Sequence, residues 1–322
     1  NMAVNVNSLK SQPLKIGVPI IKVLGVGGGG GNVINRMVED NIKGVEYIAI
    51  NTDLMVLKSS NADLKIQIGE KITRGMGAGM KPQIGRISAE ENLDSLSQIF
   101  NNTDLVFIAA GMGGGTGTGA APVIAEIAKE KKVLTIGVVT TPFSFEGSKR
   151  GKIADQGLIE LRNHVDTLIV VSNNKLLEMA SKKTSVSEAF LIADDVLKQA
   201  ISGITNLINL EGVINLDFAD LQTIMCNKGA AIMGTGFGFG ESRGCDAVHK
   251  AITSTILDQP IEGANGIIVN IVADEQFTIL DAEAAVDCVQ KSANQDADII
   301  FGLVYDPGKK DEVFVSVIAT GF

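Results

Sequence analysis

The stretch GMGGGTGTG, Gly111–Gly119, lies between the apolar run DLVFIAA (Asp104–Ala110) and the helical pattern AAPVIAEIAKE (Ala120–Glu130). Glycine loses much conformational entropy on folding, so six glycines in nine residues indicate a close approach to the main chain. A strand, a glycine loop and a helix start in this order leave unpaired N–H groups at the positive end of the helix dipole. Such an arrangement favours an anion, and we expect a phosphate.

A second glycine loop, GVGGGGGNVINRM, follows the apolar run IKVLGV and satisfies the spacing GxGxxG at Gly25, Gly27 and Gly30. Taken alone, this loop fits an NAD-dependent oxidoreductase that uses the Gly25–Gly30 fingerprint, with INTD (Ile50–Asp53) near the expected ribose-binding acid. A tight strand-to-helix turn is another alternative for a single GxGxxG. The oxidoreductase alternative lacks a His or Lys arrangement for catalysis in the second half of the chain.

Two glycine loops in one sheet predict a ligand with a longer polyphosphate than a single pyrophosphate. Neither loop contains GxxxxGK[ST], which excludes an ordinary P-loop NTPase. A third glycine segment, RGMGAGM (Arg74–Met80), follows the apolar run DLKIQIG. We expect this segment to close over the terminal phosphate.

Short apolar runs alternate with helical patterns over residues 21–175, which predicts a doubly wound parallel sheet with ligands beyond its carboxyl ends. Helical spacing over Ser185–Leu210 predicts one long helix buried between two layers. Residues 222–322 form a second unit, in which we expect the strands ADIIFGLVYD and EVFVSVIAT to face each other across the turn PGKKD. The segment GTGFGFGESRG (Gly234–Gly244) is predicted to mark a strand end and tight helix packing.

Composition narrows the class of protein. The chain has 322 residues and a formal net charge of -9, which weighs against a surface for nucleic acids or anionic membranes. Cys226, Cys245 and Cys288 have no metal-ligand spacing, so we expect reduced thiols in a cytoplasm and no zinc or redox role. His164 and His249 lie far apart in sequence, and we expect structural or surface roles for both.

The motifs GMGGGTGTGAAP, NTD, TRGMGAG, PFSFEG and NLDFAD together resemble the FtsZ family of bacterial tubulin-like cell-division GTPases, from Ile21 to Phe322. The resemblance implies a tubulin/FtsZ-like α/β fold: a doubly wound parallel-sheet GTPase domain, a long central helix, and a second α/β domain with a mixed sheet. The expected boundaries are a flexible N-terminal segment at 1–20, a GTP-binding domain at 21–184, the central helix and catalytic loop at 185–221, and the C-terminal domain at 222–322.

The function implied by the resemblance is that of a cytoskeletal protein that binds and hydrolyses GTP and polymerises head to tail into filaments of the division ring. We expect a cytoplasmic protein at the division site, with other copies of itself as its main partner. The family usually continues beyond the position of Phe322 into a linker and a short peptide, where we expect division and membrane-anchor proteins to bind. No nucleic-acid partner and no direct membrane insertion are expected.

The resemblance also implies the residues that contact the nucleotide. Phe190 and Asp194 are one helical turn apart, so a ring can stack on a purine while the carboxylate accepts both N–H groups of guanine. A core position for Phe190 is the alternative. Because Asp195 is adjacent to Asp194, the assignment of the base contact to Asp194 depends on the match of FLIADDVL to the family pattern. For Glu146 and Arg150 a ribose contact and a surface ion pair remain equally open. The expected nucleotide-binding residues are Gly27, Gly28, Gly29, Gly30, Gly31, Asn32, Ala78, Gly79, Gly114, Gly115, Thr116, Gly117, Glu146, Arg150, Asn173, Phe190 and Asp194.

The expected catalytic residues are Asn215, Asp217 and Asp220 in NLDFAD, beyond the long helix. Helical rise puts this segment far from Asp194, so we expect the two aspartates to act on the nucleotide of the next subunit. A polar turn in which Asp220 caps the following helix is the alternative. Mg²⁺ is expected with the triphosphate, held by phosphate oxygens and water, and no dedicated metal cage is visible. A scaffold that binds GTP without hydrolysing it is a third class, which the two aspartates disfavour.

Three positions depart from the family pattern: Gly31 replaces a common asparagine, Thr141 a basic residue, and Asn174 an aspartate. None of these changes removes a phosphate-cradling glycine or a catalytic acid. We expect them to alter nucleotide affinity and turnover rather than the type of activity.

Overall fold

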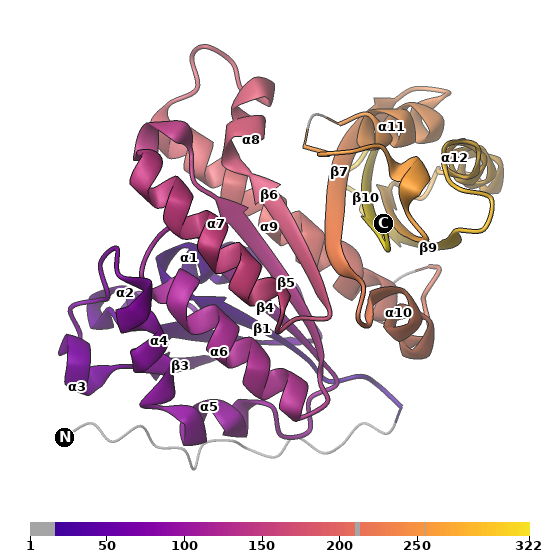
Figure 1. Cartoon of the computed structure of the whole chain (residues 1–322). Helices are drawn as coiled ribbons and strands as arrows, with labels where there is room; N and C mark the ends of the chain where they lie inside the picture. Colours follow the sequence, from indigo (N-terminus) through magenta and orange to yellow (C-terminus); the bar gives the residue numbers. More distant parts are fainter. Residues whose placement is uncertain (1–16, 210–212, 255) are drawn as a thin grey trace.

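A computed structural model describes residues 17–209, 213–254 and 256–322 of the chain. Its strands form one ten-stranded sheet in the order β3-β2-β1-β4-β5-β6-β7-β10-β8-β9 (Figure 1). The first six strands are parallel, as continuous apolar runs predict. They are β1 (Ile21–Val26), β2 (Val45–Asn51), β3 (Leu64–Gln67), β4 (Leu105–Gly111), β5 (Leu134–Thr141) and β6 (Thr167–Ser172).

Helices cover both faces of this parallel part, which confirms the doubly wound arrangement. One buried cluster joins Val33 and Ile34 of α1 to one face, and another joins Leu96 and Ile124 to the opposite face. The helices of this unit are α1 (Gly27–Glu39), α2 (Leu54–Lys58), α3 (Glu70–Thr73), α4 (Pro82–Glu90), α5 (Leu93–Ile99), α6 (Thr116–Glu130), α7 (Ser148–Arg162) and α8 (Asn173–Met179), with a 3₁₀ turn η2 (Ser144–Glu146).

The predicted long helix is α9 (Val186–Ile208), which runs from the neighbourhood of α8 towards α10 (Phe218–Met225) (Figure 1). Ser185 caps its start, with Glu188 completing a capping box. Gly203 lies inside α9, which continues through it. A Cβ at this position would lie only 3.0 Å from Ser316 Oγ on the second unit. The glycine therefore lets α9 approach the second unit closely. The predicted end at Leu210 lies outside the described residues.

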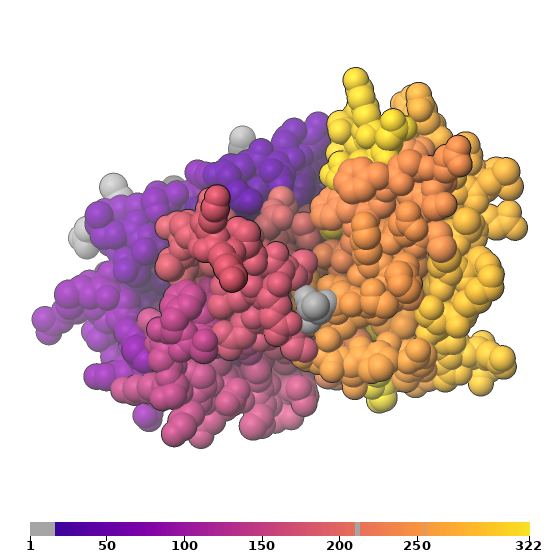
Figure 2. Space-filling view, turned by 90° about the horizontal axis from the view of Figure 1, so that it is seen from above, coloured from indigo at the N-terminus to yellow at the C-terminus, as the bar shows by residue number. Residues whose placement is uncertain are grey.

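The second unit appears as a separate lobe, coloured orange to yellow, beside the first (Figure 2). Its sheet is mixed, and only three residue pairs, from Thr167–Gly229 to Ile169–Ala231, join β6 to β7. Its elements are β7 (Gly229–Phe239), α11 (Arg243–Ile252), η3 (Ile261–Gly263), β8 (Gly266–Ala273), α12 (Ile279–Ser292), β9 (Asp298–Tyr305) and β10 (Glu312–Thr320).

Two details of the second unit differ from, or sharpen, the sequence-based expectations. The predicted pairing of the last two strands is wrong, because β10 lies between β7 and β8 and is antiparallel to both. The PGKKD turn therefore carries the chain past β8 rather than closing a hairpin. Both expectations for the glycine-rich segment are confirmed: β7 ends within it at Phe239, and a Cβ on Gly236 would lie 2.3 Å from the Ala247 carbonyl oxygen of α11.

The expectation of three reduced thiols is also wrong. Cys245 on α11 and Cys288 on α12 form a disulfide, and Cys226 is free. Sequence spacing gave no sign of the pair, because the two cysteines are 43 residues apart and meet only when α11 and α12 pack together.

We expect this disulfide to stabilise the second unit. A crosslink over 43 residues restricts the unfolded chain and typically contributes about 2–4 kcal/mol to the free energy of unfolding. The double variant Cys245→Ser/Cys288→Ser should lose that amount in urea unfolding, and a thiol reductant should lower the wild type equally. The reductant should leave the double variant unchanged; equal stability of oxidised wild type and double variant would contradict the prediction.

Candidate functional site

A groove of about 520 Å³ opens at the carboxyl ends of the parallel strands, where the starts of α1 and α6 converge. This is the place that a doubly wound sheet offers to a ligand. Fifteen residues predicted from the sequence line the groove together: Gly27, Gly28, Gly29, Asn32, Ala78, Gly79, Gly114, Gly115, Thr116, Gly117, Glu146, Arg150, Asn173, Phe190 and Asp194.

The glycine loops expose their main chain to this groove. A Cβ added to Gly28 or Gly114 would meet nothing within 4 Å, so the backbone there is open to a ligand. Other glycines let the loops approach one another: a Cβ on Gly115 would lie 2.5 Å from the Gly79 carbonyl oxygen. With α6 beginning at Thr116, the groove presents bare N–H groups and a helix dipole to an anion.

Two glycines predicted to contact the nucleotide do not line the groove. A Cβ on Gly30 would lie 2.2 Å from the Ala109 carbonyl oxygen, so Gly30 allows α1 to pack on β4. Gly31 lies one residue further into α1 and is also absent from the groove lining. The reason is that α1 begins at Gly27, so its first turn carries the later glycines away from the ligand side.

The third glycine segment is tied to the phosphate loop through Thr52. Its hydroxyl lies 2.6 Å from the Thr116 hydroxyl, and both residues are buried. The Thr52 carbonyl accepts the Gly77 N–H at 3.3 Å, and Met76 forms a bridge with Asp53. Because Thr116 begins α6, a group bound at that helix start is connected by two hydrogen bonds to the loop that carries Gly77.

Aromatic rings and an amide form the other end of the groove. Phe190 packs edge-on against Phe143 with ring centroids 5.1 Å apart, yet it stays 39% exposed and lines the groove. The ring of Phe190 therefore packs against Phe143 and also presents a surface to the groove. Asn173 is buried, and its Oδ1 has no hydrogen-bond partner within the described residues. Asn174 points elsewhere and accepts the Ser144 N–H at 2.8 Å.

The structure separates the two adjacent aspartates. Asp195 is held by Arg36 at 3.3 Å and by Lys198 at 2.7 Å, whereas Asp194 lines the groove. Burial raises the pKa of Asp194 to about 6, opposed by Arg36 and reinforced by Asp195. A carboxylate whose desolvation is only partly compensated is suited to a ligand with paired N–H donors.

Glu146 and Arg150 fit both alternatives, a surface ion pair and a contact with the ribose. They form a long ion pair at 4.0 Å across one turn, and both line the groove. Glu146 also accepts the Phe143 N–H at 2.8 Å, which fixes its carboxylate beside the aromatic end. The pair can thus contact a ligand while its partners hold it in position.

Sequence reasoning missed several lining residues at strand ends, among them Asn51 on β2 and Thr140 on β5. The rule that parallel strands end at one edge was the signal that could have identified them. Asp53, which the oxidoreductase alternative needed for a ribose, lines the groove and also caps α2 by accepting the Met55 N–H at 2.9 Å.

The three residues predicted to be catalytic lie away from the groove. Asn215, Asp217 and Asp220 are all exposed, and none of them lines it. Asp217 is the N-cap of α10 and accepts the Ala219 N–H at 3.3 Å, so the cap is Asp217 rather than Asp220. Capping occupies only part of the Asp217 carboxylate and leaves Asp220 free of side-chain hydrogen bonds within the described residues.

Comparison with known proteins agrees with this geometry. The GTPase domain of the Tubulin/FtsZ family matches residues 20–181, and the C-terminal domain of the FtsZ family matches residues 229–322. The FtsZ of M. jannaschii, solved as an empty dimer, is 42% identical to this chain with a TM-score of 0.91. That likeness covers 94% of this chain and 88% of the other.

The chain belongs to the FtsZ family. It is a GTPase, and its nucleotides are GTP and GDP. Two proteins of Haloferax volcanii share the fold: CetZ1 as a GDP-bound monomer (22% identity, TM-score 0.79, 94% of each chain) and CetZ2 as a GTPγS-bound protofilament (20%, 0.74, 93% of this chain and 92% of that one). With both glycine loops on one groove, the oxidoreductase alternative has no support.

Two further properties concern the described residues only. Across residues 17–209, 213–254 and 256–322, His, Cys, Asp and Glu side chains nowhere gather in threes in a way that could hold a metal ion. In the same ranges, no helix is both long and apolar enough to cross a membrane.

The raised pKa of Asp194 predicts that GTP affinity of this FtsZ-family chain depends on pH. If Asp194 accepts N–H groups of guanine it must be ionised to do so, and affinity should then fall about tenfold per pH unit below about pH 6. Nucleotide titrations between pH 5 and 8, with Asp194→Asn as control, separate the titration of this group from that of the phosphates; identical slopes in both proteins would contradict the assignment.

The folding stability of the ligand-free protein depends on pH with the opposite sign. Folding favours the protonated form of Asp194 between pH 3.8 and about 6, so stability falls as pH rises through that window.

Proposed function

We propose that copies of this chain assemble head to tail, and that GTP in the groove of one subunit is hydrolysed with the help of Asp217 and Asp220 of the next. The observation that carries this proposal is the position of the acids at the far end of α9. Asp194 lines the groove, whereas α9 ends at Ile208 before the chain reaches α10. Fourteen residues of helix span roughly 21 Å from Asp194 to the end of α9, and neither Asp217 nor Asp220 lines the groove of its own subunit.

Within the groove we assign each region to one part of GTP. The open backbone at Gly27–Gly29 and Gly114–Gly117 binds the phosphates, and Ala78 and Gly79 cover the terminal one. Glu146 and Arg150 contact the ribose. Phe190 stacks on guanine, Asp194 accepts its paired N–H groups, and the unpartnered Oδ1 of Asn173 accepts a further N–H.

In the reaction, water attacks the γ-phosphorus and the bond to the bridging oxygen of GDP breaks. Carboxylates of the next subunit would orient that water and accept its proton, with Asn215 beside them. Mg²⁺ would be held with the triphosphate mainly by phosphate oxygens and water, and would supply positive charge beside them. Among the carboxylates that line the groove, Asp53 caps α2, and Glu146 and Asp194 are assigned here to the ribose and the base. The proposal therefore takes the acid that acts on water from the next subunit.

Exposed apolar side chains at both ends support a head-to-tail contact. Met76 lines the groove and is 77% exposed, and Met55, next to the groove-lining Val56, is 74% exposed. At the other end Ile279 and Leu280 are 84% and 71% exposed at the start of α12. This helix follows β8, the neighbour of β9, and Leu303 of β9 accepts the Val213 N–H just before α10, so these apolar residues and the acids share one end.

A contact between unlike ends does not close on itself and grows a filament. Self-association is supported by the solved dimer of the M. jannaschii FtsZ and by the CetZ2 protofilament. We further propose a cytoplasmic filament at the division site, weakened after hydrolysis to GDP, with division and membrane-anchor proteins as further partners. The two units, 21–184 and 222–322, would then contribute unlike surfaces to each junction.

Phosphate release measured against protein concentration, together with sedimentation in GTP, tests the proposal. Turnover per molecule should rise with concentration in step with the pelleted fraction, since each added subunit completes one site. Turnover that is constant on dilution would contradict a shared site. Pelleting without phosphate release would instead indicate a scaffold.

A further inference from the structure

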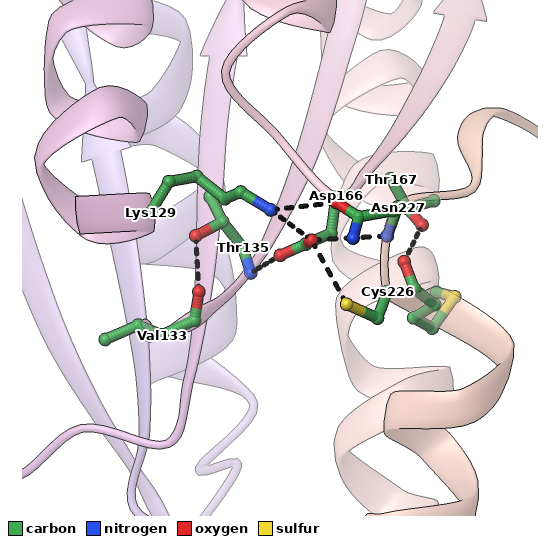
Figure 3. Close-up of polar contacts among 8 residues, drawn as sticks. Lys129, Val133, Thr135, Asp166, Thr167, Cys226 and Asn227 are labelled. Carbon is green, nitrogen blue, oxygen red and sulfur yellow. Dashed lines mark hydrogen bonds and ion pairs between the residues drawn. The ribbon is translucent and has the colours of Figure 1, made fainter. Parts of the chain in front are cut away.

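A buried carboxylate lies at the edge of the first sheet opposite the groove. Asp166 immediately precedes β6, and its side chain is only 3% exposed. Around it gather Lys129 from the end of α6, Thr135 from β5, and Cys226 and Asn227 from the end of α10 (Figure 3). We call these residues, with Thr167, the Asp166 cluster; nothing in the proposed chemistry of the groove uses it.

The carboxylate of Asp166 accepts from four donors. Oδ2 accepts the Thr135 N–H at 2.9 Å, and Oδ1 accepts the Asn227 N–H at 3.2 Å. Oδ1 also pairs with Lys129 Nζ and lies 3.6 Å from Cys226 Sγ (Figure 3). Burying a charge is costly unless it is paired and hydrogen-bonded, and here it is both. One side chain thus joins α6, β5, β6 and the chain beyond α10.

The main chain and Thr167 complete the attachment of α10. Thr167 Oγ1 donates to the Met225 carbonyl, the last residue of α10, at 2.6 Å. The Asp166 carbonyl accepts the N–H groups of Lys228 at 2.8 Å and Gly229 at 3.0 Å. The carboxyl end of α10 is therefore fixed to the first unit from two adjacent residues, while its amino end carries Asp217 and Asp220.

We propose that Asp166 is a positioning residue for hydrolysis across the junction, which holds α10 at a fixed place and direction so that Asp217 and Asp220 meet the nucleotide of the next subunit. This inference rests on the proposed function. Apolar burial of Leu221, Ile224 and Met225 attaches α10 to the core but is non-directional. Hydrogen bonds have defined lengths and angles, so the Asp166 cluster supplies the register that burial alone does not.

Three variants test this role. Asp166→Asn keeps the shape but replaces one accepting oxygen by an amide that faces other donors. Thr167→Val removes only the bond to the Met225 carbonyl and serves if Asp166→Asn does not fold. Asp104→Asn is the matched control, because Asp104 also precedes a strand of the same sheet, β4, and accepts a backbone N–H, but that of Ile20 at 2.7 Å rather than one near α10.

Binding and turnover should separate in these variants. Labelled GDP titrated into unpolymerised protein should bind all three as it binds the wild type, since the groove is at the other edge of the sheet. Phosphate release per pelleted subunit should fall about tenfold in Asp166→Asn, because misplacing catalytic groups by about 1 Å can cost 10²-fold. Thr167→Val should show a smaller loss in the same direction, and Asp104→Asn none.

The thiol of Cys226 offers a readout that does not depend on activity. Cys245 and Cys288 are bonded to each other, so a thiol reagent reports on Cys226. Burial, and then the Asp166 carboxylate, raises the pKa of this thiol. Alkylation should therefore be faster in Asp166→Asn, and unchanged in Asp104→Asn.

Wild-type turnover per pelleted subunit in both Asp166→Asn and Thr167→Val would overturn the inference. So would a loss of GDP binding equal to the loss of turnover, because that indicates a general effect on the first unit. Asp217→Asn measured alongside separates the two levels: if it hydrolyses GTP normally in the pellet, the proposed junction chemistry itself fails. If Asp217→Asn is inactive and the Asp166 cluster variants are normal, only the positioning role fails.

Discussion

Replacing Asp217 with asparagine is expected to lower GTP turnover by about 10²–10⁴-fold, the range over which a side chain that acts as a general base contributes. Asparagine caps helices as well as aspartate does, so α10 should keep its start, where Asp217 now accepts the Ala219 N–H. The change therefore removes a charge without removing the cap. Phosphate release from pelleted filaments measures the effect, and GDP binding to the unassembled protein should not change.

A mixture of two variants provides the decisive control. Under the proposed function, Asp217→Asn should bind GTP without supplying the acid, whereas Asp194→Ala should supply the acid but bind GTP poorly. Each should be nearly inactive alone, yet an equal mixture should regain activity at about a quarter of its junctions if subunits join at random. No recovery in co-sedimenting mixtures would show that each subunit uses its own acids.

Replacing Asp194 with alanine is expected to lower the preference for GTP over ATP by about 10²-fold or more, the scale on which buried hydrogen-bonding groups discriminate between ligands. Guanine presents two adjacent donors to the carboxylate, whereas adenine presents a donor beside an acceptor. Without Asp194 the guanine donors lose their partner in a desolvated groove. Direct binding of both nucleotides to unpolymerised protein measures the ratio.

The neighbouring residue supplies the matched control for this prediction. Asp195→Asn should retain base preference, because Asp195 faces Arg36 and Lys198 instead of the groove. Equal affinity of the wild type for GTP and ATP would contradict the assignment. A larger loss of preference in Asp195→Asn than in Asp194→Ala would move the base contact to the adjacent carboxylate.

Most of the groove could be predicted from the sequence because its parts are local. Each glycine loop directly follows an apolar strand and begins a helix, so strand, loop and dipole are contiguous in the chain. Gly30 shows where this reasoning stops: it belongs to the motif but packs against Ala109 on another strand. Phe190 and Asp194 were identifiable as a pair because helical periodicity alone puts them on one face.

Features that depend on distant segments were not predictable in the same way. The disulfide between Cys245 and Cys288 and the insertion of β10 between β7 and β8 arise from packing across 40 residues or more. Asp166 accepts from donors in α6, in β5 and in the chain just after α10, and its sequence context, HVDTL, resembles any strand start. No local pattern distinguishes a carboxylate that will be surrounded by donors from one that faces solvent.

The sequence by itself determined that this protein cradles a polyphosphate and reads a purine, because backbone freedom and helical spacing are properties of neighbouring residues. Only the tertiary structure decided which aspartate faces the groove, which one caps α10, and which glycines of the motifs line the groove. Those outcomes depend on the rigid length of α9 and on which side chains come together when the sheet closes. Separation in space between groups distant in the chain is a property of packing, and packing is not encoded in any single stretch.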